Sequence, residues 1–124
     1  MTASRLNLLM IRAADVERAV AFYRGLGLAF ERERHGTGPI HYSARCDGTV
    51  FEIYPVRPGE VASASVRLGF CVPDVREATA ALLGAGGVLR NGASAGRSVV
   101  IDPDGNAVEL TCVGQDIAAT NSPR

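Results

Sequence analysis

One order of motifs occurs twice in the sequence, and this internal repeat restricts the fold more than any other feature. Short apolar runs at residues 6–11 and 65–72 each precede a segment with helical spacing, at residues 15–27 and 74–86. Both helical segments open with Asp-Val and end in glycine residues, which are favoured at helix starts and ends respectively. The repeat therefore predicts two copies of one supersecondary module.

Each helical segment is followed by three further strand patterns. A weak edge-strand pattern comes first, at residues 28–35 and 88–90, and a hairpin pattern comes second. The first hairpin turns at Asp47-Gly48, and the second turns within the sequence DPDGN. Each half thus reads as strand, helix and three strands, an α+β pattern written βαβββ.

Strand alternation separates the residues of each final strand into two faces. In VFEIY, residues 50–54, Phe51 and Ile53 point to one face and Glu52 to the other. The sequence AVELT, residues 107–111, repeats this arrangement with Glu109 in the place of Glu52. We expect the uniformly apolar face to pack beneath the helix. A carboxylate between large apolar residues, found twice, marks the other face as a candidate site, although a solvated outer face is the simpler reading.

The turn sequences also predict which residues lie beside the two glutamates. The residues DPDGN suit a three-residue loop with a left-handed glycine, and pairing outward from that loop places Val99 beside Glu109. The repeat then places Tyr42 beside Glu52. A slip of one residue would place His41 there instead, so His41 is the alternative neighbour.

Composition excludes several classes of function. All 13 basic residues are arginine and they balance 13 acidic residues, so an electrostatic footprint for nucleic acid or for a membrane surface is not expected. No apolar stretch approaches the ~20 residues of a membrane helix. The three cysteines, Cys46, Cys71 and Cys112, have no CxxC spacing, which favours buried thiols in a reducing, cytoplasmic compartment over a disulfide frame or zinc site.

The arrangement resembles the vicinal-oxygen-chelate superfamily, which includes glyoxalase I, extradiol dioxygenases and bleomycin-resistance proteins. The resemblance spans about residues 5–114. It is carried by DVERAVAFYRGLGL in the first half and DPDGNAVEL in the second. It implies a fold in which two tandem βαβββ modules form mixed sheets that curl into a ligand cleft, and it implies a homodimer.

We therefore expect one glyoxalase-like domain over residues 1–124. Its parts are a first module at residues 5–55, a linker at 56–65, a second module at 66–114 and a loose tail at 115–124. Whether the two modules pair within one chain or across a dimer stays open, because a linker of this length permits either.

The resemblance also assigns a metal to this cleft in some members, held by the two glutamate positions and by two positions on the first strand of each module. Here those two strand positions are Leu8 and Arg67, seven residues before each helix-opening aspartate. Leucine cannot coordinate a metal, and a guanidinium repels a dication. We therefore expect no tightly bound metal. The alternative is a Zn, Ni, Mn or Fe ion on Glu52 and Glu109, or on a rearranged set that includes His41 or Tyr42.

In the place of the metal we expect Arg67, Glu52 and Glu109 to converge as a charge cluster and, in an enzyme, as the catalytic groups. The residues expected to line the cleft around them and contact a small polar-aromatic ligand are Leu8, Met10, Tyr42, Tyr54, Cys71 and, as the reserve, His41. The simpler reading of the charge cluster is an ion pair that holds the modules together.

Three functions follow from the resemblance. The first is a metal-free protein that binds a small organic molecule, as bleomycin-resistance proteins do, and the residues favour it. The second is a lyase or isomerase of glyoxalase type with a glutamate as general base. The third, an extradiol dioxygenase, lacks the expected two histidines and one carboxylate.

Overall fold

The computed structural model describes residues 2–92, 94 and 96–112. The predicted order of elements is confirmed in both halves. The first half comprises β1 (Leu8–Ala13), α1 (Val16–Arg24), β2 (Glu31–Glu33), β3 (His41–Cys46) and β4 (Thr49–Pro55). The second half comprises β5 (Arg67–Val72), α2 (Val75–Gly84), β6 (Val88–Leu89), β7 (Arg97–Ile101) and β8 (Ala107–Cys112). The predicted tail lies outside the described residues.

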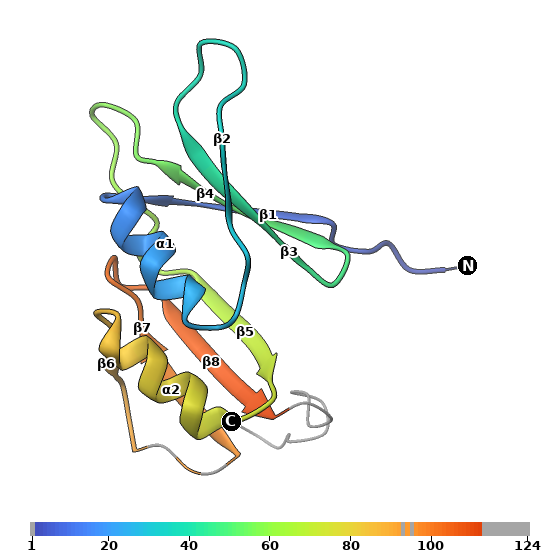
Figure 1. The fold of residues 1–124 in the computed structure, drawn as a ribbon, viewed down its shortest axis with the longest axis vertical. Coiled ribbons are helices and arrows are strands. Elements are labelled where there is room, and N and C mark those ends of the chain that lie inside the picture. Colours follow the sequence, from blue (N-terminus) through green and yellow to red (C-terminus); the bar gives the residue numbers. More distant parts are fainter. Residues whose placement is uncertain (1, 93, 95, 113–124) are drawn as a thin grey trace.

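Two four-stranded sheets form, one from each half, and both have the same topology. Their strand orders are β1-β4-β3-β2 and β5-β8-β7-β6, with the first strand of each module parallel to its last strand and the other pairs antiparallel. The structure is thus α+β with two βαβββ modules, as predicted. In Figure 1 the first sheet occupies the upper half and the second sheet the lower half, with the two helices along one side.

The helices begin where the sequence predicts. The Asp15 carboxylate accepts a hydrogen bond from the Arg18 backbone N–H at 3.1 Å, and Asp74 accepts one from the Glu77 backbone N–H at 3.0 Å. These bonds satisfy one of the free amide groups in each first turn. Gly25 follows the last residue of α1 and lies against α2, since a methyl group at Gly25 would approach the Leu82 side chain to 3.1 Å. The ends of the two helices therefore pack together.

The buried apolar residues of the two modules form one core, in which the ring centroids of Phe51 on β4 and Phe70 on β5 are 6.2 Å apart. Phe51 and Ile53 of β4, and Val108 and Leu110 of β8, are all buried, as strand alternation predicts. The Tyr23 ring of α1 packs edge-on against Phe51 with the ring centroids 5.1 Å apart. Both sheets therefore turn their apolar faces toward the helices, and the mixed face of the first sheet, with the half-buried Glu52, is left for solvent or a ligand.

The DPDGN hairpin fixes the second module to the first, since the Asp104 carboxylate accepts a hydrogen bond from the Ala14 N–H at 3.2 Å. Its Gly105 has φ +103°, and the Asp102 N–H donates to the Asn106 carbonyl at 2.8 Å, which closes the predicted three-residue loop. The Asn106 side chain is fully buried, donates to the Ser63 carbonyl at 2.8 Å and accepts from the Val66 N–H at 3.0 Å. This motif therefore holds the linker as well as the turn.

Candidate functional site

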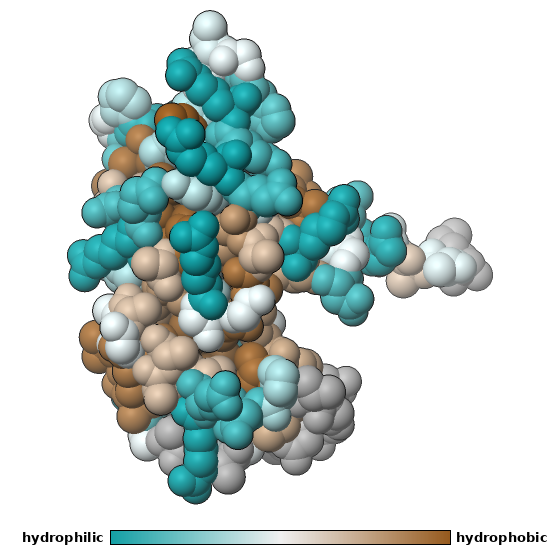
Figure 2. Space-filling model, in the orientation of Figure 1, coloured by the Kyte–Doolittle hydropathy of each residue, from teal (hydrophilic) through white to brown (hydrophobic). Residues whose placement is uncertain are grey.

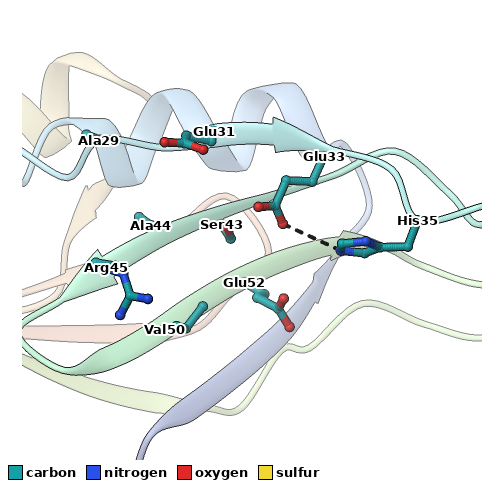
Figure 3. A pocket seen from close by; sticks show the side chains of 9 residues that line it. All are labelled: Ala29, Glu31, Glu33, His35, Ser43, Ala44, Arg45, Val50 and Glu52. Atoms are coloured by element: carbon teal, nitrogen blue, oxygen red, sulfur yellow. Dashed lines mark ion pairs between the residues drawn. The ribbon is translucent and has the colours of Figure 1, made fainter.

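The mixed face of the first sheet carries a polar cleft with a volume of about 600 Å³. Glu52 lines it and lies between Met10 of β1 and Ser43 of β3 in the strand register. In Figure 3 the Glu33 carboxylate points from β2 toward the His35 ring, while Glu52 projects from β4 on the same face. The polar side chains that line the cleft are Glu31, Glu33, His35, Ser43, Arg45 and Glu52.

Carboxylates dominate the charge of this cleft. Glu31, Glu33 and Glu52 line it together with one guanidinium, that of Arg45. Burial raises the pKa of Tyr54, and the negative charges of Glu52 and Glu33 raise it further. Figure 2 shows hydrophilic residues gathered over the upper half of the molecule, where β2 and β3 lie. The cleft therefore favours positive charge and hydrogen-bond donors over anions.

An apolar strip borders the carboxylates. Leu8 and Met10 on β1 pair with Val50 and Glu52 on β4. The exposed fraction is 50% for Leu8 and 39% for Met10. Leu6, just before β1, is 65% exposed. β1 is the outermost strand of its sheet in the described part of the chain, so this strip lies along an open edge. Exposed apolar side chains beside carboxylates offer a surface for an amphiphilic ligand or for another protein.

The register of the first hairpin differs from the prediction by one residue. Ser43, rather than Tyr42 or His41, lies beside Glu52. The reason is the turn: Asp47 and Gly48 have φ angles of 49° and 90°, a two-residue loop, whereas the second hairpin has three residues in its loop. The loop that is one residue shorter shifts β3 by one position and exchanges its two faces.

Tyr42 consequently does not line the cleft, and that prediction is wrong. It lies opposite Ile53, on the face covered by α1, and is 6% exposed. Its hydroxyl donates to the Glu17 carboxylate on α1 at 2.7 Å, and this hydrogen bond is the main cause of its raised pKa. The Tyr42 hydroxyl therefore links β3 to α1.

His41 lies on the cleft side of β3 but is only 1% exposed. Its ring stacks on the Tyr54 ring, with centroids 4.0 Å apart and an interplanar angle of 7°. Its Nδ1 lies 3.2 Å from the Pro39 carbonyl oxygen, and its Nε2 lies 3.2 Å from Glu33 Oε1. His41 thus forms part of the wall beneath the cleft rather than of its open lining.

On the second sheet, Glu109 is 2% exposed and is paired with two arginines. Arg97 Nε donates to Glu109 Oε2 at 2.5 Å, and Arg67 Nη2 lies 3.5 Å from Glu109 Oε1. The structure therefore brings Arg67 to Glu109 as expected and adds Arg97. The predicted pairing of Val99 with Glu109 is confirmed. Arg97 precedes Val99 by two residues on the same face, so the register already contained the signal for Arg97.

Glu52 does not join this pair, so the expected three-residue cluster is not formed. No ion pair among the described residues links Glu52 to Arg67, and the cleft around Glu52 is lined by the first module alone. Cys71 lies on the second sheet, where it accepts a long hydrogen bond from Thr111 Oγ1 at 3.7 Å. The two glutamates therefore belong to separate sites within one chain.

The model of the Glyoxalase/Bleomycin resistance protein/Dioxygenase superfamily matches residues 5–110, and the chain belongs to this superfamily. No curated protein sequence matches the chain. No helix in the described part of the chain is long and apolar enough to cross a membrane.

Solved structures share the fold at low sequence identity. A glyoxalase/bleomycin resistance protein from Albidiferax ferrireducens aligns with a TM-score of 0.70 and 21% identity over 88% of this chain and 98% of that one. The trypanothione-dependent glyoxalase I of Leishmania major aligns with a TM-score of 0.69 and 21% identity over 91% and 89%. An antibiotic-binding protein from a Streptomyces species aligns with a TM-score of 0.66 and 22% identity over 90% and 98%.

The residues at the metal positions implied by the family do not fit a metal ion. Leu8 has no donor atom, and Arg67 places a permanent positive charge 3.5 Å from Glu109. Both oxygens of Glu109 are already paired with arginines. These positions therefore lack the donor set that a metal ion requires.

Proposed function

We propose that this protein binds a small amphiphilic organic cation in the cleft of the first sheet, without a metal ion on Glu52 and Glu109. Glu52 carries this proposal, because it is half-buried in mid-strand and faces a cleft of about 600 Å³. That volume falls within the range of about 300–1,000 Å³ typical of small-molecule sites. A carboxylate held in this way is suited to a positively charged or hydrogen-bond-donating ligand.

The apolar strip supplies the other half of such a site. Leu8, Met10 and Val50 form apolar surface beside Glu52, on which the hydrocarbon part of a ligand can lie. The antibiotic-binding relative from Streptomyces shows that the fold serves binding proteins as well as enzymes. Because that relative is 22% identical, its antibiotic is not transferred to this chain.

We further propose that a second copy of the chain covers the open edge of the cleft. Leu6, Leu8 and Met10 are exposed along β1, an outermost strand, and such edges are usually covered in stable proteins. A homodimer would bury this strip and make the cleft deeper.

The three cysteines form no disulfide among the described residues, which favours a reducing compartment such as the cytoplasm.

A fluorescence titration tests the proposed ligand class. The probe is proflavine, a fluorescent planar aromatic cation, and the counter-probe is pyrene-1-sulfonate, a fluorescent planar aromatic anion. We expect saturable binding of proflavine and none of the anion. Glu52→Gln should weaken proflavine binding by roughly tenfold, equivalent to about 1.4 kcal/mol.

The matched control is Glu60→Gln, because Glu60 is exposed in the linker and its replacement changes the net charge equally. Glu60→Gln should leave proflavine binding unchanged. Equal losses in the two variants would show that only the overall charge attracts the dye. Absence of saturable binding, or a preference for the anion, would contradict the proposal.

A further inference from the structure

The only two histidines of the chain lie together at one end of the cleft and share a carboxylate. Their ring centroids are 5.0 Å apart. Glu33 Oε1 lies 3.2 Å from His41 Nε2 and 3.8 Å from His35 Nε2. One ligand atom from each of the three residues lies within 4.8 Å of the other two.

The short connection between β2 and β3 produces this arrangement. Glu33 is the last residue of β2, His35 follows two residues later, and His41 is the first residue of β3. Glu33 and His41 are direct partners in the antiparallel register, so their side chains share one face of the sheet. The loop then returns the His35 ring over the same face, and Figure 3 shows the Glu33 carboxylate aimed at it.

The buried histidine is oriented in the way that metal-binding histidines are. Its Nδ1 is 3.2 Å from the Pro39 carbonyl oxygen, and a carbonyl can only accept a proton, so Nδ1 carries the N–H. Stacking on Tyr54 fixes the plane of the ring. In the neutral ring Nε2 then presents a lone pair toward Glu33 and His35, which is the donor atom that a metal requires.

That nitrogen is left without a hydrogen bond among the described residues. His41 Nε2 is fully buried, and its approach to Glu33 at 3.2 Å does not have hydrogen-bond geometry. A buried polar atom without a partner costs about 1–3 kcal/mol, so such atoms are rare unless another group completes them. A cation placed between Nε2 and the Glu33 carboxylate would satisfy both.

We propose that Glu33, His35 and His41 bind one divalent transition-metal ion, with Zn²⁺ as the preferred ion and water in the remaining position. Two imidazole nitrogens and one carboxylate oxygen form a donor set that Zn²⁺ prefers and that Mg²⁺ and Ca²⁺ do not. Tetrahedral Zn²⁺ with bonds of about 2.0–2.1 Å needs its donor atoms about 3.3 Å apart. The distances from Glu33 Oε1 to the two histidine nitrogens, 3.2 and 3.8 Å, bracket that value, and His35 is exposed enough to adjust.

This site differs from the metal positions of the superfamily in both its residues and its strands. It uses β2, β3 and the loop between them, whereas the implied family positions here are Leu8, Glu52, Arg67 and Glu109 on other strands. The proposal does not rest on the proposed ligand. Proflavine titrations in the presence of a chelator report on the cleft alone.

Titration of the chelator-treated full-length protein with ZnCl₂ tests the site. Calorimetry should give one Zn²⁺ per chain, and MgCl₂ should give no binding. Because the chain has only two histidines, proton NMR shows two imidazole Cε1–H signals, and both should shift to completion at one equivalent of Zn²⁺. His35→Ala and Glu33→Gln should each weaken Zn²⁺ binding by more than about tenfold, since even outer-shell partners contribute that much. Both residues are partly exposed, so these variants should fold.

Glu31→Gln is the matched control, because Glu31 lies on the same face of β2 and lines the same cleft. It should leave Zn²⁺ affinity unchanged. The spectrum of the Co²⁺-substituted protein separates this site from the cysteines, since a thiolate ligand would give an intense charge-transfer band and the proposed donors would not. A thiolate band, a shift of only one histidine signal, or unchanged affinity in His35→Ala would each overturn the proposal.

Discussion

The Tyr23 hydroxyl donates a 2.6 Å hydrogen bond to the Asp102 carboxylate, and this contact joins the helix of the first module to the hairpin of the second. Asp102 is 4% exposed and also accepts from the Asn106 and Asp104 backbone N–H groups at 2.9 and 2.8 Å. The Asp102 carboxylate is thus satisfied from both modules. This explains why an aspartate opens the DPDGN sequence: it organises the turn and anchors the helix.

Tyr23→Phe tests how much that hydrogen bond contributes to the free energy of unfolding. The variant leaves the ring packing intact but removes a hydrogen bond to a charged group, so the free energy of unfolding should fall by about 1.5–3 kcal/mol. Urea denaturation measures it. Tyr54→Phe is the control: its hydroxyl makes no hydrogen bond among the described residues, so its effect should stay within about 0.5 kcal/mol. Equal effects in the two variants would show that the Tyr23–Asp102 contact adds nothing.

The same residue predicts a dependence on alkaline pH. Burial raises the pKa of Tyr23 above its ordinary value, and the charge of Asp102 raises it further. The unfolded chain therefore releases the phenolic proton first, at a pKa of about 10. Above that pH, loss of the proton lowers the free energy of the unfolded state relative to the folded state, so each pH unit should cost the parent about 1.4 kcal/mol of stability. The ordinary tyrosine pKa of about 10 lies between pH 9 and 11. Over this range the free energy of unfolding should fall less steeply with pH in Tyr23→Phe than in the parent. Parallel curves would contradict this assignment.

Two glycines of the second module should respond in opposite ways to alanine. A methyl group at Gly87 would lie 2.6 Å from both Phe22 Cε1 and Val100 Cγ1, so Gly87→Ala should destabilise the protein by about 1–3 kcal/mol or more. Gly84 ends α2 and has open space around it, so Gly84→Ala should be neutral or stabilising by up to about 1 kcal/mol. Thermal denaturation compares the two. A stable Gly87→Ala variant would mean that α1 does not pack as closely on the second sheet.

Arg97 should stabilise the buried Glu109 carboxylate more than Arg67 does. The Arg97 contact is 2.5 Å, whereas Arg67 is 3.5 Å away and its side chain is 56% exposed. Arg97→Leu should therefore cost about 2–3 kcal/mol in unfolding free energy and Arg67→Leu less than about 1 kcal/mol. The double variant Arg97→Leu, Glu109→Leu should recover part of the loss, because it removes the buried charge together with its partner. Additive losses in that double variant would show that the two residues do not interact.

The sequence predicted the fold more completely than the site because local signals determine the elements. Aspartate caps, glycine stops and strand alternation act over a few residues, so the order of elements and the buried faces of β4 and β8 are confirmed. The register of β3 depends instead on the number of residues in the turn. The Asp47-Gly48 loop is one residue shorter than its counterpart, and this difference turned Tyr42 toward the helix and placed Ser43 beside Glu52.

Local sequence patterns could not predict the contacts between the modules. The Tyr23–Asp102 bond and the merged core link residues that are 79 positions apart or belong to different sheets. The failure of Glu52 to meet Arg67 has the same origin, since the relative placement of two sheets is a tertiary property. The position of the histidines needed both the β2–β3 register and the path of the intervening loop.

Amide NMR can locate the residues that proflavine contacts. Saturating dye should shift the amide signals of residues that line the cleft, chiefly Ser43, Arg45, Val50 and Glu52, and should leave the signals around Glu109 on the second sheet in place. Glu52→Gln should reduce these shifts at equal dye concentration, and Glu60→Gln should not. Shifts centred on the second sheet, or scattered over the surface without saturation, would contradict the assignment of the first-sheet cleft as the binding site.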